Sequence, residues 1–132
     1  MLLGVKDRNV QIGSPTRRTI RAFLAFETAT FAIAALIHAN VLPLGDPHEA
    51  AATGESVIAV IVLVGLALTW AGIMSVATIG MIAQGLALLG TLVGIFTIAA
   101  GAGPRTAPDV AYHLAISGVL VVGLVVASRR LA

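Results

Sequence analysis

The sequence contains no cysteine, few aromatic residues and few charges. The absence of cysteine excludes a disulfide framework, a thiolate metal site and thiol redox chemistry. Aromatic residues make up 5% of the chain and are not interleaved with the basic ones, so nucleic-acid bases have no surface on which to stack. We therefore expect no nucleic-acid partner, and we attribute the basic isoelectric point to arginines that flank apolar runs.

Charged residues make up only 11% of the chain, whereas apolar residues make up 58%. Soluble globular domains carry about 25% charged residues, so this balance is typical of a chain surrounded largely by lipid. Most charges lie in the first 21 residues, in two short loops and at the C-terminal end, while Glu27 lies inside an apolar run. The composition therefore predicts an integral membrane protein.

Four apolar segments are long enough to cross a membrane, because a hydrocarbon core of about 30 Å needs roughly 20 residues of helix. They would form one transmembrane domain over 16–132, preceded by a cytoplasmic tail at 1–15. The expected fold class is all-α, a transmembrane four-helix bundle in up-down-up-down order. We expect its helices at about 18–42, 47–70, 76–100 and 107–130.

Turn and cap residues mark the expected boundary between the first two helices. Proline and glycine end helices, so Pro43 and Gly45 predict that the first helix stops near residue 42. The residues that follow match a helix start, with Asp46 as N-cap, Pro47 in the first turn and Glu49 as the acid of a capping box. The second helix should therefore begin near Pro47.

The other two connections carry similar signals. Gly72 favours a tight turn and Ser75 is a suitable N-cap, which predicts that the third helix begins near residue 76. In the last connection, Thr106 and Asp109 have the spacing of a capping box. The fourth helix should therefore begin directly after Thr106.

The basic residues predict which side of the membrane each end occupies. Lysine and arginine flank the two termini, whereas a single arginine, Arg105, lies in a connection on the opposite side. Positively charged flanks stay in the cytoplasm, so we expect both termini there. We expect a multi-pass protein of a bacterial cytoplasmic membrane, with the acids Asp46, Glu49 and Asp109 near the outer face.

Polar side chains from three helices are expected to gather near the outer face. In an up-down-up-down bundle, the end of the first helix and the starts of the second and fourth reach the same membrane surface. His38 and His113 each lie about one turn inside a helix end, so they should sit at similar depth. His48 and Glu55 are seven residues apart, close to two helical turns, and therefore share one face.

These residues predict a site for a divalent metal ion such as zinc, with His38, Glu55 and His113 as ligands. Asp109 lies four residues before His113, and its carboxylate would accept the other imidazole N–H. His48 is an accessory residue in this interpretation. One alternative is a b-type haem held between His38 and His113. In another, His48 is solvated, Asp109 only caps its helix, and His38 hydrogen-bonds across helices.

Glu27 is an acid deep inside the first apolar run, where a charge costs roughly 3 kcal/mol unless it is protonated or partnered. Glu27 and His38 lie on one helix face about 16 Å apart, which suggests a proton or ion path between them through water. Gln84, Thr28 and Trp70 are the candidate partners of Glu27. The alternative is a neutral Glu27 that hydrogen-bonds to Gln84 and serves helix packing.

Two stretches resemble small, uncharacterised four-span bacterial membrane proteins, namely ESVIAVIVLVGLALTW (55–70) and QGLALLGTLVGIFTIAAGAGPRTAPDVAYH (84–113). The resemblance implies a bacterial membrane setting and no particular activity.

The sequence shows no enzyme motif, because it lacks a nucleophile elbow and a phosphate-binding glycine loop. We therefore expect a small membrane protein in which His38, Glu55 and His113 hold a metal ion or a polar ligand, with Glu27 as a proton relay. One alternative is a non-catalytic accessory subunit or homo-oligomeric scaffold of a larger redox or transport complex. Another is a subunit that contacts quinone or a similar lipid-soluble molecule.

Overall fold

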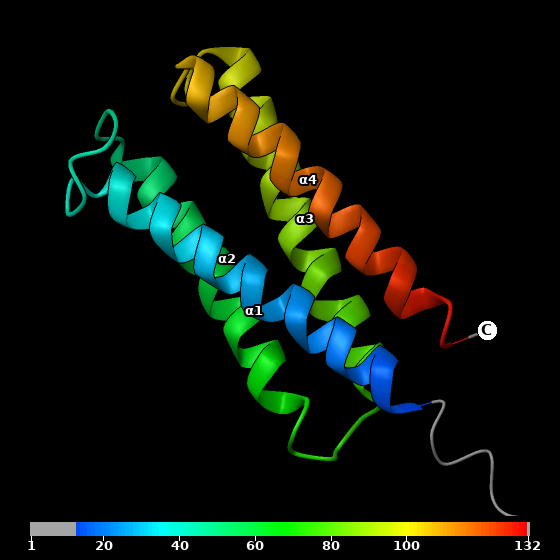
Figure 1. Ribbon diagram of the computed structural model, residues 1–132. Coiled ribbons are helices and arrows are strands. Elements are labelled where there is room, and N and C mark those ends of the chain that lie inside the picture. Colours follow the sequence, from blue (N-terminus) through cyan, green and yellow to red (C-terminus); the bar gives the residue numbers. More distant parts are fainter. Residues whose placement is uncertain (1–12, 132) are drawn as a thin grey trace, which may run out of the picture.

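The computed structural model describes residues 13–131, and these form four α-helices (Figure 1). All four are long and apolar enough to cross a membrane, so the chain has the architecture of a multi-pass membrane protein. Residues 1–12 of the expected tail lie outside the described residues. The helices are α1 (Gly13–His38), α2 (Glu49–Leu68), α3 (Val76–Ala100) and α4 (Ala107–Ser128).

Helix α1 begins and ends earlier than its expected bounds of 18 and 42. Its end is determined by Asn40, which adopts a left-handed backbone conformation with φ of 59°. The amide of Asn40 donates to the Ile37 carbonyl and the amide of Val41 to the Leu36 carbonyl. This is the Schellman pattern of a helix end, and asparagine is one of the residues that tolerate it. Pro43 and Gly45 therefore lie in the following loop, not at the helix end.

The expected start of α2 at Asp46 and Pro47 is wrong. The N-cap is His48, whose backbone is extended and whose Nδ1 accepts a hydrogen bond from the Ala51 amide at 3.2 Å. The amide of His48 also donates to the carbonyl of His38, which ties the loop back to the end of α1. The helix runs to Leu68 and stops two residues before the expected end at Trp70.

The predictions for the starts of α3 and α4 are confirmed. Ser75 caps α3 by accepting from the Thr78 amide, and Gly101, with φ of 85°, ends that helix. Thr106 and Asp109 form the predicted capping box at the start of α4. Helix α4 ends at Ser128, slightly before the expected residue 130, and Arg129 is its C-cap.

The four helices pack around one apolar core and present apolar side chains outward as well. Leu24 of α1, Val62 of α2, Ala87 of α3 and Leu120 of α4 are fully buried. Large apolar side chains cover the outer faces, including Phe26, Val60, Leu89 and Leu114. Lipid tails solvate such side chains as well as a protein core does, so these outer faces match a hydrocarbon environment.

Helices α2 and α3 approach closely where glycine replaces a larger residue. A Cβ at Gly65 would lie 2.6 Å from the Cβ of Ala83, and a Cβ at Gly90 would lie 2.8 Å from the Cδ1 of Ile58. Small residues at helix contacts are typical of membrane bundles, because they let the two backbones pack directly.

The connections between helices lie at both ends of the bundle. The α1–α2 and α3–α4 connections lie at one end, and the α2–α3 connection lies at the other, beside the start of α1 (Figure 1). At this second end, the Arg21 guanidinium donates to the hydroxyl and carbonyl oxygens of Thr69 at 3.0 and 2.7 Å and lies 4.4 Å from the centre of the Trp70 ring. These contacts join α1 to the C-terminal end of α2.

Candidate functional site

His38, the last residue of α1, lies between two carboxyl groups from two other helices. Its Nδ1 is 2.7 Å from Oε2 of Glu55 on α2, and its Nε2 is 3.1 Å from Oδ1 of Asp109 on α4. Both His38 and Glu55 are 5% exposed. A single imidazole therefore connects α1, α2 and α4, and we call these three residues the acid–histidine cluster.

Asp109 is held in the acid–histidine cluster by the local structure of the α4 start. Its Oδ2 accepts hydrogen bonds from the backbone amide and the hydroxyl of Thr106, while its Oδ1 faces His38. The capping box thus orients one carboxylate oxygen toward the helix end and leaves the other for His38. Asp109 serves as a helix cap and as a site residue at the same time.

His113 lies one turn further along α4 and contacts the backbone of Asp109, not its carboxylate. His113 Nδ1 is 2.8 Å from the carbonyl oxygen of Asp109, so Nδ1 carries the proton and donates. In the neutral ring, Nε2 is then a free acceptor. A Cβ at Gly94 would lie 3.0 Å from His113 Nε2, so this glycine makes room for the ring on α3.

His48 lies near the same end of the bundle, where its side chain caps α2. Because His48 Nδ1 accepts the Ala51 amide, the proton of a neutral His48 ring is on Nε2. The side chain is half-buried and lines the pocket described next. Among the described residues, the His48 side chain has no hydrogen bond to the acid–histidine cluster, and the contact is limited to its backbone amide, which donates to the His38 carbonyl. The structure thus brings together the side chains of His38, Glu55 and Asp109 and leaves that of His48 beside them.

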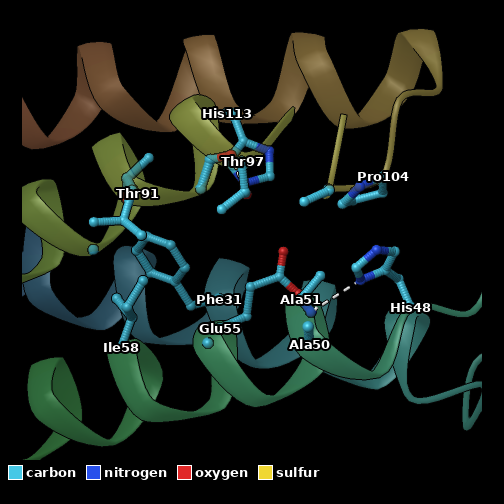
Figure 2. A pocket seen from close by; sticks show the side chains of 16 residues that line it. Phe31, His48, Ala50, Ala51, Glu55, Ile58, Thr91, Thr97, Pro104 and His113 are labelled. Carbon is cyan, nitrogen blue, oxygen red and sulfur yellow. Dashed lines mark hydrogen bonds between the residues drawn. The ribbon is translucent and has the colours of Figure 1, made fainter. Parts of the chain in front are cut away.

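A pocket of about 250 Å³ lies between α2 and the α3–α4 pair, and we call it the ligand pocket. Figure 2 shows Glu55 on one wall and His113 on the opposite wall, with Thr97 of α3 beside His113 and Thr91 of α3 near Phe31. Oε2 of Glu55 is taken by His38, whereas Oε1 is buried and has no hydrogen-bond partner among the described residues. Glu55 therefore lines the pocket and carries one buried carboxyl oxygen that no described residue satisfies.

A second pocket of about 410 Å³ lies on the other side of the acid–histidine cluster, between α1 and α4. His38 and Asp109 line it together with Tyr112 and Asp46. Glu55 lines the ligand pocket but not this second pocket. The acid–histidine cluster therefore forms part of the wall between the two pockets.

The described part of the chain contains no group of three or more histidine, aspartate or glutamate side chains arranged to hold a metal ion. Both nitrogens of His38 already face carboxyl oxygens, and Nδ1 of His48 is used by the helix cap. Ligation of zinc or haem by His38 requires one of its two contacts to break. The atoms left free in the ligand pocket are Glu55 Oε1 and His113 Nε2.

Glu27 lies at the centre of its span, eleven residues from each end of Thr16–His38. Its Oε1 accepts a hydrogen bond from Gln84 Nε2 at 2.9 Å, and both side chains are fully buried. Of the other two expected partners, Thr28 donates to the Leu24 carbonyl and Trp70 stacks with Arg21 instead. Neither of the two pockets beside the acid–histidine cluster is lined by Glu27.

Sequence reasoning did not identify Thr91, Thr97 or Gly94 as site residues. Threonine and glycine are common in membrane helices, so only the rotation of α3 shows that these three face the ligand pocket. The spacing of three residues between Thr91, Gly94 and Thr97 is the one signal in the sequence that places them on a single helix face.

Comparisons of this chain with protein family models, with curated proteins and with solved structures find no match.

Proposed function

We propose that this chain is a small multi-pass protein of a bacterial cytoplasmic membrane that binds a small polar ligand in the ligand pocket. Glu55 and His113 contact the ligand, and His38 with Asp109 hold Glu55 in position. The proposed topology is up-down-up-down with both termini in the cytoplasm, which puts the pocket at the outer face. The basic residues beside the two ends of the chain support this orientation.

The observation that carries the proposal is the free oxygen of Glu55. A buried polar atom left without a hydrogen bond costs about 1–3 kcal/mol, and more when the group is charged. Glu55 Oε1 is buried without a hydrogen-bond partner among the described residues, and the Glu55 side chain lines a cavity large enough for several non-hydrogen atoms. A ligand that hydrogen-bonds to this oxygen removes that cost, which provides a source of binding free energy.

The two carboxyl groups around His38 support a positioning role for that residue. Glu55 Oε2 and Asp109 Oδ1 each face a different ring nitrogen, so the imidazole holds α2 and α4 at a set distance. A ligand contact fixed in this way loses little conformational freedom on binding, which favours affinity.

Glu27 has no proton-relay role in the proposed function. Glu27 contacts Gln84 at the centre of the span, and the buried side chains of Phe31 and Ala34 lie between it and His38 along α1. This arrangement favours the packing role for Glu27.

Two glycine variants test the proposal. Gly54 lines the ligand pocket, and a Cβ there meets nothing within 4 Å, so Gly54→Leu fills space without a clash at the backbone. Gly118 is exposed, as Gly54 is, and a Cβ there also meets nothing within 4 Å. Because Gly118 lines neither of the two pockets, Gly118→Leu is the matched control.

The experiment measures the thermal unfolding midpoint of the full chain in lipid nanodiscs with zinc chloride, sodium acetate, acetamide or propylammonium chloride. A ligand present at about 100 times its Kd adds about 2.7 kcal/mol to the free energy of unfolding. We expect at least one probe to stabilise the wild type and Gly118→Leu but not Gly54→Leu. Equal behaviour of the two variants with every probe contradicts the proposal.

A further inference from the structure

The polar side chains on the helical walls of the ligand pocket present hydrogen-bond acceptors inward. Glu55 contributes its free Oε1, which is an acceptor when the carboxyl group is ionised. His113 contributes Nε2, because its Nδ1 proton is donated to the Asp109 carbonyl. These two acceptors come from opposite walls of the pocket (Figure 2).

The two threonines of α3 have the same character. The Thr91 hydroxyl donates its proton to the Ala87 carbonyl at 2.8 Å, and the Thr97 hydroxyl donates to the Gly94 carbonyl at 2.8 Å. A hydroxyl has one proton and two lone pairs, so each oxygen keeps acceptor capacity and no donor for the pocket. Four polar side chains of α2, α3 and α4 thus offer acceptors to an occupant.

The charge of the ionised site is negative, which favours the same kind of occupant as the acceptors do. Glu55 and Asp109 share His38, so even with His38 protonated the ionised acid–histidine cluster keeps one net negative charge. Within residues 13–131, no basic side chain other than histidine lines the pocket, and the exposed Arg105 donates to the Ile98 carbonyl. His48, the N-cap of α2, supplies one N–H donor to the lining.

From this arrangement we infer that the ligand of the pocket is a small alkylammonium ion, a primary or secondary amine in its charged form. The inference rests on the proposed function and specifies the class of ligand for the same site. The N–H groups of such an ion match the acceptors Glu55 Oε1, His113 Nε2 and Thr97 Oγ1. Its short alkyl chain matches the apolar wall formed by Phe31, Ile58 and Val93.

A divalent metal fits the pocket less well than an ammonium ion. Zinc in proteins takes three or four protein ligands at about 2.0–2.3 Å, and two free ligand atoms of suitable type face this pocket. Threonine hydroxyls are poor zinc ligands but good acceptors for an ammonium N–H. An anion is disfavoured wherever Glu55 and Asp109 are ionised, because like charges repel.

The test is isothermal titration calorimetry of the full chain in nanodiscs with propylammonium chloride and tetramethylammonium chloride. The two probes have the same charge, but tetramethylammonium has no N–H donor. We expect saturable binding of propylammonium and none of tetramethylammonium. Glu55→Gln should weaken binding by roughly 10- to 100-fold, because it removes a charge-assisted hydrogen bond.

Further variants keep the test independent of the folding of Glu55→Gln. Thr97→Val preserves the shape of the side chain and removes one acceptor, so we expect roughly 3- to 10-fold weaker binding of propylammonium. Gly54→Leu should abolish binding and Gly118→Leu should leave the Kd unchanged.

Each remaining outcome overturns a defined part of the account. Equal binding of the two ammonium ions shows that N–H donors are not recognised and overturns the inference. Binding of zinc or acetate alone, lost in Gly54→Leu, overturns the inference and leaves the proposed function in place. If none of the probes binds, both are overturned.

Discussion

His38 Nδ1 lies 2.7 Å from Glu55 Oε2, and the two side chains, from different helices, are each 5% exposed. The contact joins α1 to α2 and leaves the second oxygen of Glu55 without a partner among the described residues. It therefore stabilises helix packing and, in the proposed function, positions Glu55 for the ligand, so it is a suitable starting point for mutation.

His38→Ala should strongly lower the stability of the protein. Removing one partner of a buried, hydrogen-bonded charged pair leaves the other unpaired, at a cost of about 3–5 kcal/mol. His48→Ala is the comparison, since it removes a helix cap from a half-buried position and should cost about 0.5–2 kcal/mol. The measurement is the free energy of unfolding in mixed detergent micelles, and similar losses for the two variants contradict the geometry around His38.

Gln84→Leu should destabilise the protein by about 1–3 kcal/mol, because it leaves the fully buried Glu27 without its partner. The double variant Glu27→Leu/Gln84→Leu should recover most of that loss, since replacing both members by apolar residues removes the unpaired group. A double-mutant cycle on the unfolding free energy checks this coupling. Additive effects of the two single changes argue against a packing pair.

Gly94→Ala should weaken propylammonium binding with little effect on stability. The new Cβ would lie 3.0 Å from His113 Nε2, so the ring must shift away from its position over α3. Gly85→Ala is the control on the same helix, because its Cβ meets nothing within 4 Å and it lines neither pocket. Titration calorimetry gives both Kd values, and an unchanged Kd for Gly94→Ala removes His113 from the list of ligand contacts.

The proposed orientation in the membrane can be tested directly because the chain has no cysteine. Ala102→Cys places a thiol in the exposed α3–α4 connection, and Leu131→Cys places one at the exposed opposite end. A membrane-impermeant maleimide should label Ala102→Cys on spheroplasts and should label Leu131→Cys only after lysis. The reverse pattern would place the ligand pocket at the cytoplasmic face.

The positions of the helices could largely be predicted from the sequence. Apolar length indicates each span, and the caps Ser75 and Thr106 act through local hydrogen bonds that depend on neighbouring residues alone. The end of α1 and the start of α2 were harder to predict from the sequence. Asn40 adopts its left-handed conformation and His48 acts as the cap because the loop packs back on α1, where the His48 amide reaches the His38 carbonyl.

The gathering of the polar site residues at one end of the bundle could also be predicted, but their contacts could not. Short connections between successive helices bring the end of α1 and the starts of α2 and α4 together, whatever the helix rotations are. Helix rotation then decides which atoms meet, and it directs the Asp109 carboxylate to His38, whereas the sequence suggested His113 as its partner. Periodicity along one helix carries no information about rotation relative to a neighbour.

The most direct test of the account is the carboxyl ¹³C signal of Glu55 during titration with propylammonium chloride. The chain has three glutamates, Glu27, Glu49 and Glu55, so ¹³C-glutamate labelling gives three carboxyl signals that single substitutions assign. We expect the Glu55 signal to shift saturably while the signals of Glu27 and Glu49 stay in place, and we expect no shift with tetramethylammonium. A Glu55 signal that does not respond, or three signals that move together, would contradict the claim that Glu55 is the ligand contact of this protein.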